Sequence, residues 1–89
     1  MSEYAGPATI TAPDAEPVPV TAFLFSTRDP ATGLGVWGGR ATVEPPATLW
    51  EAYNSIWAVL TIGDRSGDII ITSYGEESSE LQGSGEPPF

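Results

Sequence analysis

Ile56-Trp57-Ala58-Val59-Leu60-Thr61-Ile62 and Ile69-Ile70-Ile71-Thr72-Ser73-Tyr74 flank a polar stretch from Gly63 to Asp68. Both flanks are rich in β-branched and aromatic residues, and Gly, Asp and Ser between them indicate a tight turn, so the pattern predicts a β-hairpin. Strand side chains alternate between two faces, and apolar groups fall on both: Ala58 and Leu60 opposite Trp57 and Val59, then Ile69 and Ile71 opposite Ile70. We therefore expect this hairpin in the middle of a sheet or in the wall of a closed barrel.

Further strands are predicted on both sides of the hairpin, at Tyr4–Ala12, Val18–Thr27, Leu34–Val43 and, as a short last strand, Glu80–Gln82. Pro7 cannot donate a ladder hydrogen bond, which places that end of the first strand at a sheet edge. The third strand contains Gly35, Gly38 and Gly39, which weaken a strand unless they permit a bend or a close backbone approach. Trp37 can then cover the glycine surface of a neighbouring strand.

One helical signal lies within Glu44–Asn54, where Pro46 suits a first helical turn and Leu49, Trp50 and Tyr53 fall on one side. We expect one to two turns that plug a barrel end or cover a sheet face. The predicted fold class is all-β: a small five- to six-stranded, mainly antiparallel barrel or sandwich with one short helix. At 89 residues the chain is expected to be a single domain, with an extended C-terminal tail over residues 82–89.

The charge balance narrows the choice of partners. The chain has 12 acidic residues against three arginines, with a formal net charge of -9, and it has no lysine or histidine. Nucleic acid and anionic membranes are poor partners, because binding to phosphate groups requires clustered Lys or Arg. A basic protein partner and simple solubility both fit the acidic balance. No apolar run approaches the roughly 20 residues of a membrane span, and the N-terminus has no signal-peptide pattern, so we expect a cytoplasmic protein or a component of a larger particle assembled there.

The side-chain inventory disfavours catalysis. Without histidine, cysteine or lysine, a Ser-His-Asp triad and a thiolate nucleophile are excluded, and the acids lie in predicted turns and loops. We expect no enzymatic activity and no cofactor. Asp64–Asp68 and the acids Glu76, Glu77 and Glu80 offer oxygen ligands, but an ordinary hairpin turn and a solvated loop explain them, so no metal site is predicted.

Three motifs spread along the chain carry a resemblance: Tyr4-x-Gly6-x-Ala8, Pro30-x-x-Gly33-x-x-x-Trp37-x-Gly39-Arg40 and Gly83-x-Gly85-x-Pro87-Pro88-Phe89. The chain resembles a small actinobacterial domain family of unknown function, found alone or attached to flavin-dependent monooxygenase-like proteins. Members of that family often carry a histidine or a second aromatic residue near the tryptophan, where this chain has Gly35, Val36 and Gly38. The resemblance implies a fold class rather than an activity.

Five residues are candidates for binding a ligand or a partner: Trp37, Arg40, Trp50, Tyr53 and Phe89. Arg40 follows Trp37 and two glycines, and it is interpreted either as a guanidinium presented to a carboxylate or phosphate, or as a structural pair with Glu44 or Glu51 or an outward strand residue. Aromatic residues left exposed beside the short helix would be interface anchors or the lining of a pocket. Phe89, after the stiff Pro87-Pro88, docks either on its own barrel or on a neighbour.

Two functions fit these observations. The first is a non-enzymatic protein–protein interaction or structural module, as an accessory or decorating subunit of a larger assembly or through self-association. The second is a small-molecule-binding barrel accessory to a redox enzyme, with Trp37, Arg40, Trp50 and Tyr53 lining one cavity.

Overall fold

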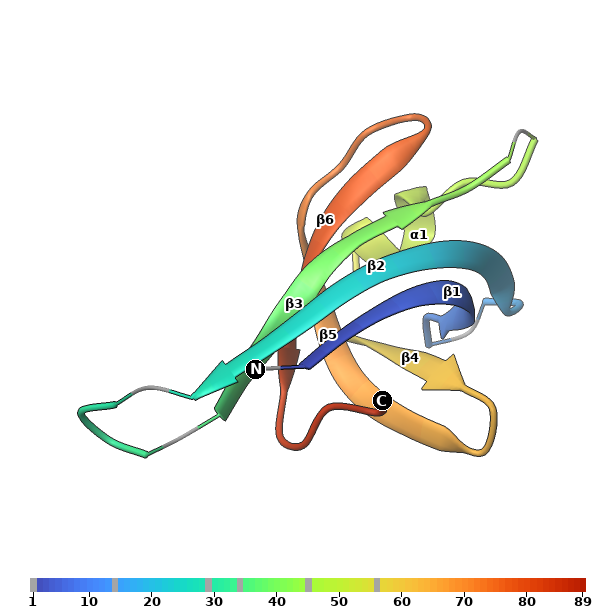
Figure 1. Ribbon diagram of the computed structural model, residues 1–89. Helices are drawn as coiled ribbons and strands as arrows, with labels where there is room; N and C mark the ends of the chain where they lie inside the picture. Colours follow the sequence, from blue (N-terminus) through green and yellow to red (C-terminus); the bar gives the residue numbers. More distant parts are fainter. Residues whose placement is uncertain (1, 14, 29, 34, 45, 56) are drawn as a thin grey trace.

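The computed structural model is a closed barrel of six antiparallel strands in the order β1-β2-β3-β6-β5-β4 (Figure 1). The structure describes residues 2–13, 15–28, 30–33, 35–44, 46–55 and 57–89, and for residue 2 the backbone alone. The elements are β1 (Ser2–Thr11), β2 (Val18–Arg28), β3 (Gly35–Thr42), α1 (Trp50–Tyr53), β4 (Ala58–Ile62), β5 (Arg65–Ser73) and β6 (Ser78–Ser84). The predicted all-β class with one short helix is confirmed, and of the two architectures considered the barrel is the one that forms.

The barrel consists of two three-stranded meanders. β1, β2 and β3 pair in sequence order; after α1 the chain returns beside β1 as β4, and β6 then closes the barrel on β3. The β2–β3 hairpin extends beyond the body of the barrel, where Thr27 pairs with Val36 and Arg28 with Gly35 (Figure 1).

The central hairpin is present, but its turn is shorter than predicted. β4 ends at Ile62 and β5 begins at Arg65, so only Gly63 and Asp64 connect them, and Gly63 takes a φ of 61° that favours glycine. The prediction of a turn as far as Asp68 was wrong because polarity was taken as a sign of a loop. Ser66 and Asp68 are exposed strand residues that pair with Thr61 and Val59. Ile56 lies outside the described residues.

The last strand is likewise longer than predicted. β6 covers Ser78–Ser84, so Ser78 and Ser79, which precede the predicted strand Glu80–Gln82, pair with β3 across from Thr42 and Ala41. The tail therefore begins after Ser84 rather than at residue 82, and Gly85, with a φ of 74°, follows the strand.

The core follows the predicted alternation. Among the described residues, the buried positions of the strands hold small or aliphatic side chains apart from Trp37, and the partly buried Tyr4 packs against them. The buried cluster comprises Ala8, Ile10, Ala12, Val20, Ala22, Leu24, Trp37, Ala41, Val43, Leu49, Ala52, Ala58, Leu60, Ile69, Ile71 and Leu81. Side chains of the chain itself thus pack together in the barrel interior, as expected for a barrel of few strands.

The edge predicted at Pro7 is confirmed. β1 pairs with β2 from Ser2 to Ile10 but with β4 only from Thr9 to Thr11, so in the described part of the chain the segment around Pro7 is paired on one side. The Tyr4 hydroxyl donates a hydrogen bond of 2.6 Å to the Pro7 carbonyl. Pro7 has no N–H, so neither backbone group of this residue needs a neighbouring strand, and the edge is protected from pairing at this point.

The helix is one turn long and packs against β5. Its buried contacts differ from the prediction: Leu49 and Ala52 face the core, whereas Trp50 and Tyr53 are exposed. Leu49 and Ala52 lie three residues apart and so share a face, and the small Ala52 lets the turn approach the barrel closely. No helix in the described part of the chain has the length and apolar character needed to cross a bilayer.

Candidate binding face

A row of outward-facing positions crosses four neighbouring strands of the barrel. In register, Phe25 on β2 pairs with Gly38 on β3, Gly38 with Gln82 on β6, and Gln82 with Ile70 on β5. Neighbouring strands are about 4.8 Å apart, so the missing side chain at Gly38 leaves a gap between Phe25 and Gln82. We call these four positions the outer row, and the outward surface of β2, β3, β6 and β5 the outer face.

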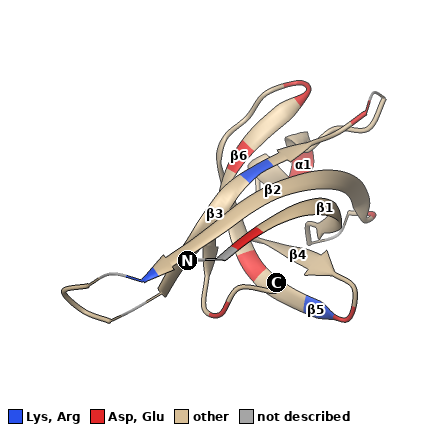
Figure 2. Ribbon diagram, in the orientation of Figure 1, with Lys and Arg blue, Asp and Glu red and all other residues tan. Residues whose placement is uncertain are grey.

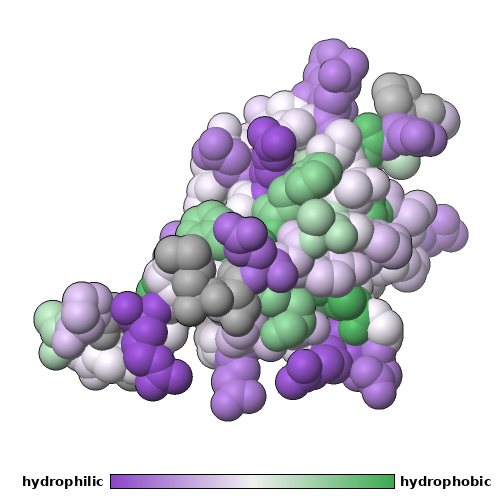
Figure 3. All heavy atoms as spheres, in the orientation of Figure 1, coloured by the Kyte–Doolittle hydropathy of each residue, from purple (hydrophilic) through white to green (hydrophobic). Residues whose placement is uncertain are grey.

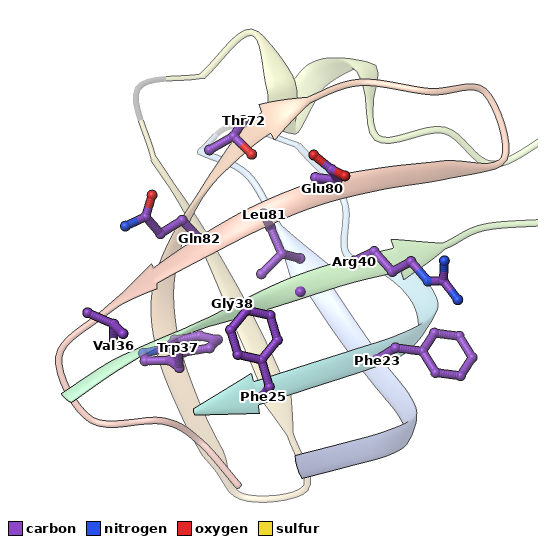
Figure 4. A pocket seen from close by; sticks show the side chains of 11 residues that line it. Phe23, Phe25, Val36, Trp37, Gly38, Arg40, Thr72, Glu80, Leu81 and Gln82 are labelled. Atoms are coloured by element: carbon purple, nitrogen blue, oxygen red, sulfur yellow. The ribbon is translucent and has the colours of Figure 1, made fainter. Parts of the chain in front are cut away.

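The gap is part of a hollow of about 620 Å³, the Gly38 hollow. Its walls are the outward side chains of Phe23, Phe25, Val36, Arg40, Glu80 and Gln82, and Figure 4 shows these side chains arrayed over β2, β3 and β6. Trp37 and Leu81 also line it, although both side chains are buried. The hollow therefore has apolar walls with a cation, an anion and an amide at its margin.

Local packing explains why glycine occupies two positions of the floor. A Cβ at Gly38 would lie 2.7 Å from the Leu81 carbonyl oxygen, and a Cβ at Gly39 would overlap the Phe23 carbonyl oxygen. Gly39 also has a φ of 149°, which side chains disfavour. The close backbone approach predicted for the glycine-rich strand is confirmed, and it creates the hollow on the outer face as a consequence.

Large apolar side chains are exposed along this face. Phe23, Phe25, Val36, Trp57 and Ile70 are each between 41% and 48% exposed. Trp57, just before β4, lines a second hollow of about 450 Å³ together with Ile70 and Gln82, so the apolar surface continues beyond the outer row. Figure 3 shows apolar groups gathered over the middle of β2 and β3 with hydrophilic groups around them. Exposed aromatic residues with a polar rim are typical of interaction surfaces.

Arg40 is the cation of this face. Its guanidinium carbon lies 5.2 Å from the centre of the Phe23 ring, within the range of a cation–π contact. Glu80 is its cross-strand neighbour on β6, but Figure 4 shows the Arg40 side chain directed away from Glu80. Arg40 is thus an outward strand residue at the margin of the hollow, in contact with Phe23.

Trp37 and Phe89 meet at one end of the barrel. Trp37 is 2% exposed and lies against Gly83 and Gly67 on β6 and β5, so the predicted covering of glycines by this tryptophan is confirmed. The Phe89 ring packs edge-on to Trp37 with centroids 6.2 Å apart and lies 6.1 Å from the Tyr4 ring, while Pro88 is buried. In this chain the tail thus folds onto its own barrel. The Trp37 Nε1–H is buried there without a hydrogen-bond partner.

Trp50 and Tyr53 lie on α1, where they form an aromatic cluster with Tyr74. Trp50 packs edge-on to Tyr74 at 5.1 Å, and Tyr53 stacks on the same ring at 5.6 Å. The Tyr74 hydroxyl is 2.8 Å from Thr48 Oγ1. The cavity expected from Trp37, Arg40, Trp50 and Tyr53 together does not form: Trp37 and Arg40 line the Gly38 hollow, whereas Trp50 lines a different depression beside Ile10 and Pro17.

Phe25, Gln82 and Ile70 were not predicted as candidate residues. Their signal was present, because alternation put Phe25 and Ile70 opposite the inward residues of their strands. Which strands lie side by side was not readable, and the outer row exists only because β3 pairs with β6.

Acidic groups are dispersed over strands, loops and helix (Figure 2). Among the described residues no group of three or more carboxylates is placed to hold a metal ion. The described carboxylates are all exposed, so this part of the chain lacks the buried, paired acids on which carboxylate chemistry depends.

Comparison with family models matches residues 1–89 to a domain of unknown function (DUF4873). No curated protein and no solved structure matches the chain.

Proposed function

The chain belongs to the DUF4873 family, whose function is unknown, and we propose from its geometry that it is a non-catalytic protein-interaction module. It binds a protein partner through the outer face, with the Gly38 hollow at the centre of the contact.

The observation that carries the proposal is the exposure of five large apolar side chains at two adjoining hollows on the outside of a small barrel: Phe23, Phe25 and Val36 at the Gly38 hollow, and Trp57 and Ile70 at the second hollow. Their inward neighbours already fill the core, so packing within the chain does not account for them. Aromatic residues around a depression are the common anchors of protein interfaces, because they bury large areas with few rotatable bonds.

The geometry of the Gly38 hollow favours a side chain of a partner over an enclosed ligand. The hollow lies on the outside of the barrel, between side chains that are themselves exposed. Sites for small molecules usually enclose most of the ligand surface, whereas a protein partner covers an open depression and its rim together.

The test compares three forms of the protein: the natural chain, Phe25→Ser and Trp50→Ser. Phe25 and Trp50 are both exposed aromatic residues, 48% and 52% respectively, but Trp50 lies on α1, so its substitution is the matched control. Each form is immobilised, and proteins retained from the cells that produce the chain are identified by mass spectrometry. We expect a defined protein on the natural chain and on Trp50→Ser, and its loss on Phe25→Ser. Equal retention by Phe25→Ser would exclude the outer face as the docking surface.

A further inference from the structure

We infer that the partner of the outer face is a basic protein surface that inserts one large apolar side chain into the Gly38 hollow and places Lys or Arg beside the outer row. This inference rests on the proposed function and adds the chemistry of the partner to it. Three features of the outer face support this inference: the position of its carboxylates, the contact of Arg40 with the Phe23 ring, and the shape of the Gly38 hollow.

Carboxylates flank the outer row on both sides. Glu80 lies on β6 two residues before Gln82, so its side chain is outward in the next row, and it lines the Gly38 hollow. Asp68 lies two residues before Ile70 on β5 and lines the second hollow with Trp57. Both side chains are exposed. When a partner inserts an apolar side chain into the outer row, the residues next to that side chain therefore approach Glu80 or Asp68.

Arg40, the cation of the outer face, does not reverse the preference of this face for a basic partner. Arg40 is held over the Phe23 ring, and the chain as a whole has a net charge of -9. A field of this sign attracts basic partners and raises their association rate, and it repels a second copy of the same chain. Charge complementarity thus selects a basic partner over self-association.

The hollow sets the position of the anchor. Gly38 contributes no side chain, and Phe25 and Gln82 stand on its two sides in register, so an aromatic or large aliphatic group can rest between them. Substituting Gln82 with Phe fills this space from an exposed position without changing the glycine backbone, and it should block insertion. Gly38 itself is unsuitable for such a test, since a Cβ there would meet the Leu81 carbonyl.

The experiment selects peptides from a phage-displayed random library on the immobilised natural chain and measures their affinities by isothermal titration calorimetry. We expect enriched peptides that combine an aromatic or large aliphatic residue with Lys or Arg. Phe25→Ser and Gln82→Phe should each weaken their binding by about tenfold or more, as loss of a central anchor does. Trp50→Ser should leave the affinity unchanged. The double variant Asp68→Asn/Glu80→Gln should weaken binding several-fold and reduce its salt dependence, and thermal unfolding checks that every variant is folded.

The outcomes separate the inference from the proposed function. Enriched peptides that are apolar but neutral or acidic, and that still require Phe25, would overturn the basic partner and leave the docking face in place. A dimer by light scattering that Phe25→Ser dissolves would replace the basic partner with a second copy. Peptides that bind Phe25→Ser as well as the natural chain, or no enrichment, would count against the docking face itself.

Discussion

The indole ring of Trp37 occupies the space that a side chain at Gly83 would fill. A Cβ on Gly83 would overlap the ring, and a Cβ on Gly67, on the next strand, would come within 2.8 Å of it. Trp37 enters from β3, so three strands meet in one contact at this end of the barrel. The largest inward side chain is accommodated by two inward positions without side chains, which keeps the interior close-packed.

This contact predicts that Gly83→Ala is destabilising. The added methyl group must displace a fully buried ring, and overpacking of this kind costs about 1–3 kcal/mol. Gly35→Ala is the matched control, because a Cβ at Gly35 has only the Thr27 carbonyl oxygen nearby, at 3.8 Å. Urea unfolding monitored by circular dichroism should show a lower midpoint for Gly83→Ala and a change within about 0.5 kcal/mol for Gly35→Ala. Equal stability of the two variants would contradict the packing described here.

The contact of Phe89 with Trp37 and Tyr4 predicts a structural role for the tail. Phe89→Ala removes a half-buried ring, so we expect a loss of about 1–2 kcal/mol, below the 3–5 kcal/mol typical of a fully buried Phe. Water should then reach Trp37, and its fluorescence emission should shift to longer wavelength. Glu86→Ala, at an exposed position of the same tail, is the control and should change neither quantity. An unshifted emission in Phe89→Ala would mean that the ring does not cover Trp37 in solution.

The location of the tail also changes what a deletion experiment measures. A tail that reached a neighbour would make assembly depend on Glu86–Phe89, but Pro88 and Phe89 pack on their own barrel. A deletion would therefore mix loss of folding stability with any loss of binding. Variants of the outer face avoid this problem, because Phe25, Gln82 and Ile70 are exposed.

The hydrogen bond from Tyr4 to the Pro7 carbonyl predicts a small effect of its removal. Tyr4→Phe keeps the ring against Phe89 and removes only the hydroxyl, so we expect a loss of about 0.5–1 kcal/mol in the free energy of unfolding. Tyr53→Phe is the control: the hydroxyl is removed from an exposed ring on α1. If Tyr4→Phe were as stable as the natural chain, the Tyr4 hydroxyl would not stabilise the sheet edge at Pro7.

Alternation along single strands was readable from the sequence, and pairing between distant strands was not. The inward positions Val20, Ala22 and Leu24 and the outward Phe23 and Phe25 follow from a period of two. The neighbours of β3 do not, since the chain passes through α1, β4 and β5 before β6 pairs with it. For that reason Gln82 and Ile70, which belong to the outer row only through this pairing, were not predicted as candidates, whereas Trp37 and Arg40 on β3 were.

The buried face of the helix does not follow from the spacing of its apolar residues. Leu49, Trp50 and Tyr53 fit one helical face, yet the structure buries Leu49 with Ala52 and leaves both aromatic rings against Tyr74. In a helix of a single turn the contact with β5 decides which side is buried, and a small residue permits the closer approach. Spacing alone therefore identified the helix but not its buried face.

The contact of Arg40 with Phe23 predicts a measurable coupling between two exposed residues. A double-mutant cycle with Arg40→Gln and Phe23→Leu isolates the pairwise contribution, because both replacements keep most of the aliphatic packing. We expect a coupling free energy of about 0.5 kcal/mol, at the low end for cation–π contacts, because both side chains are exposed. A second cycle with Arg40→Gln and Glu80→Gln tests the alternative cross-strand partner and should give a smaller value, since the Arg40 side chain is directed away from Glu80. A larger coupling with Glu80 than with Phe23 would mean that Arg40 neutralises Glu80 in solution, and it would remove one of the two carboxylates from the surface offered to a basic partner.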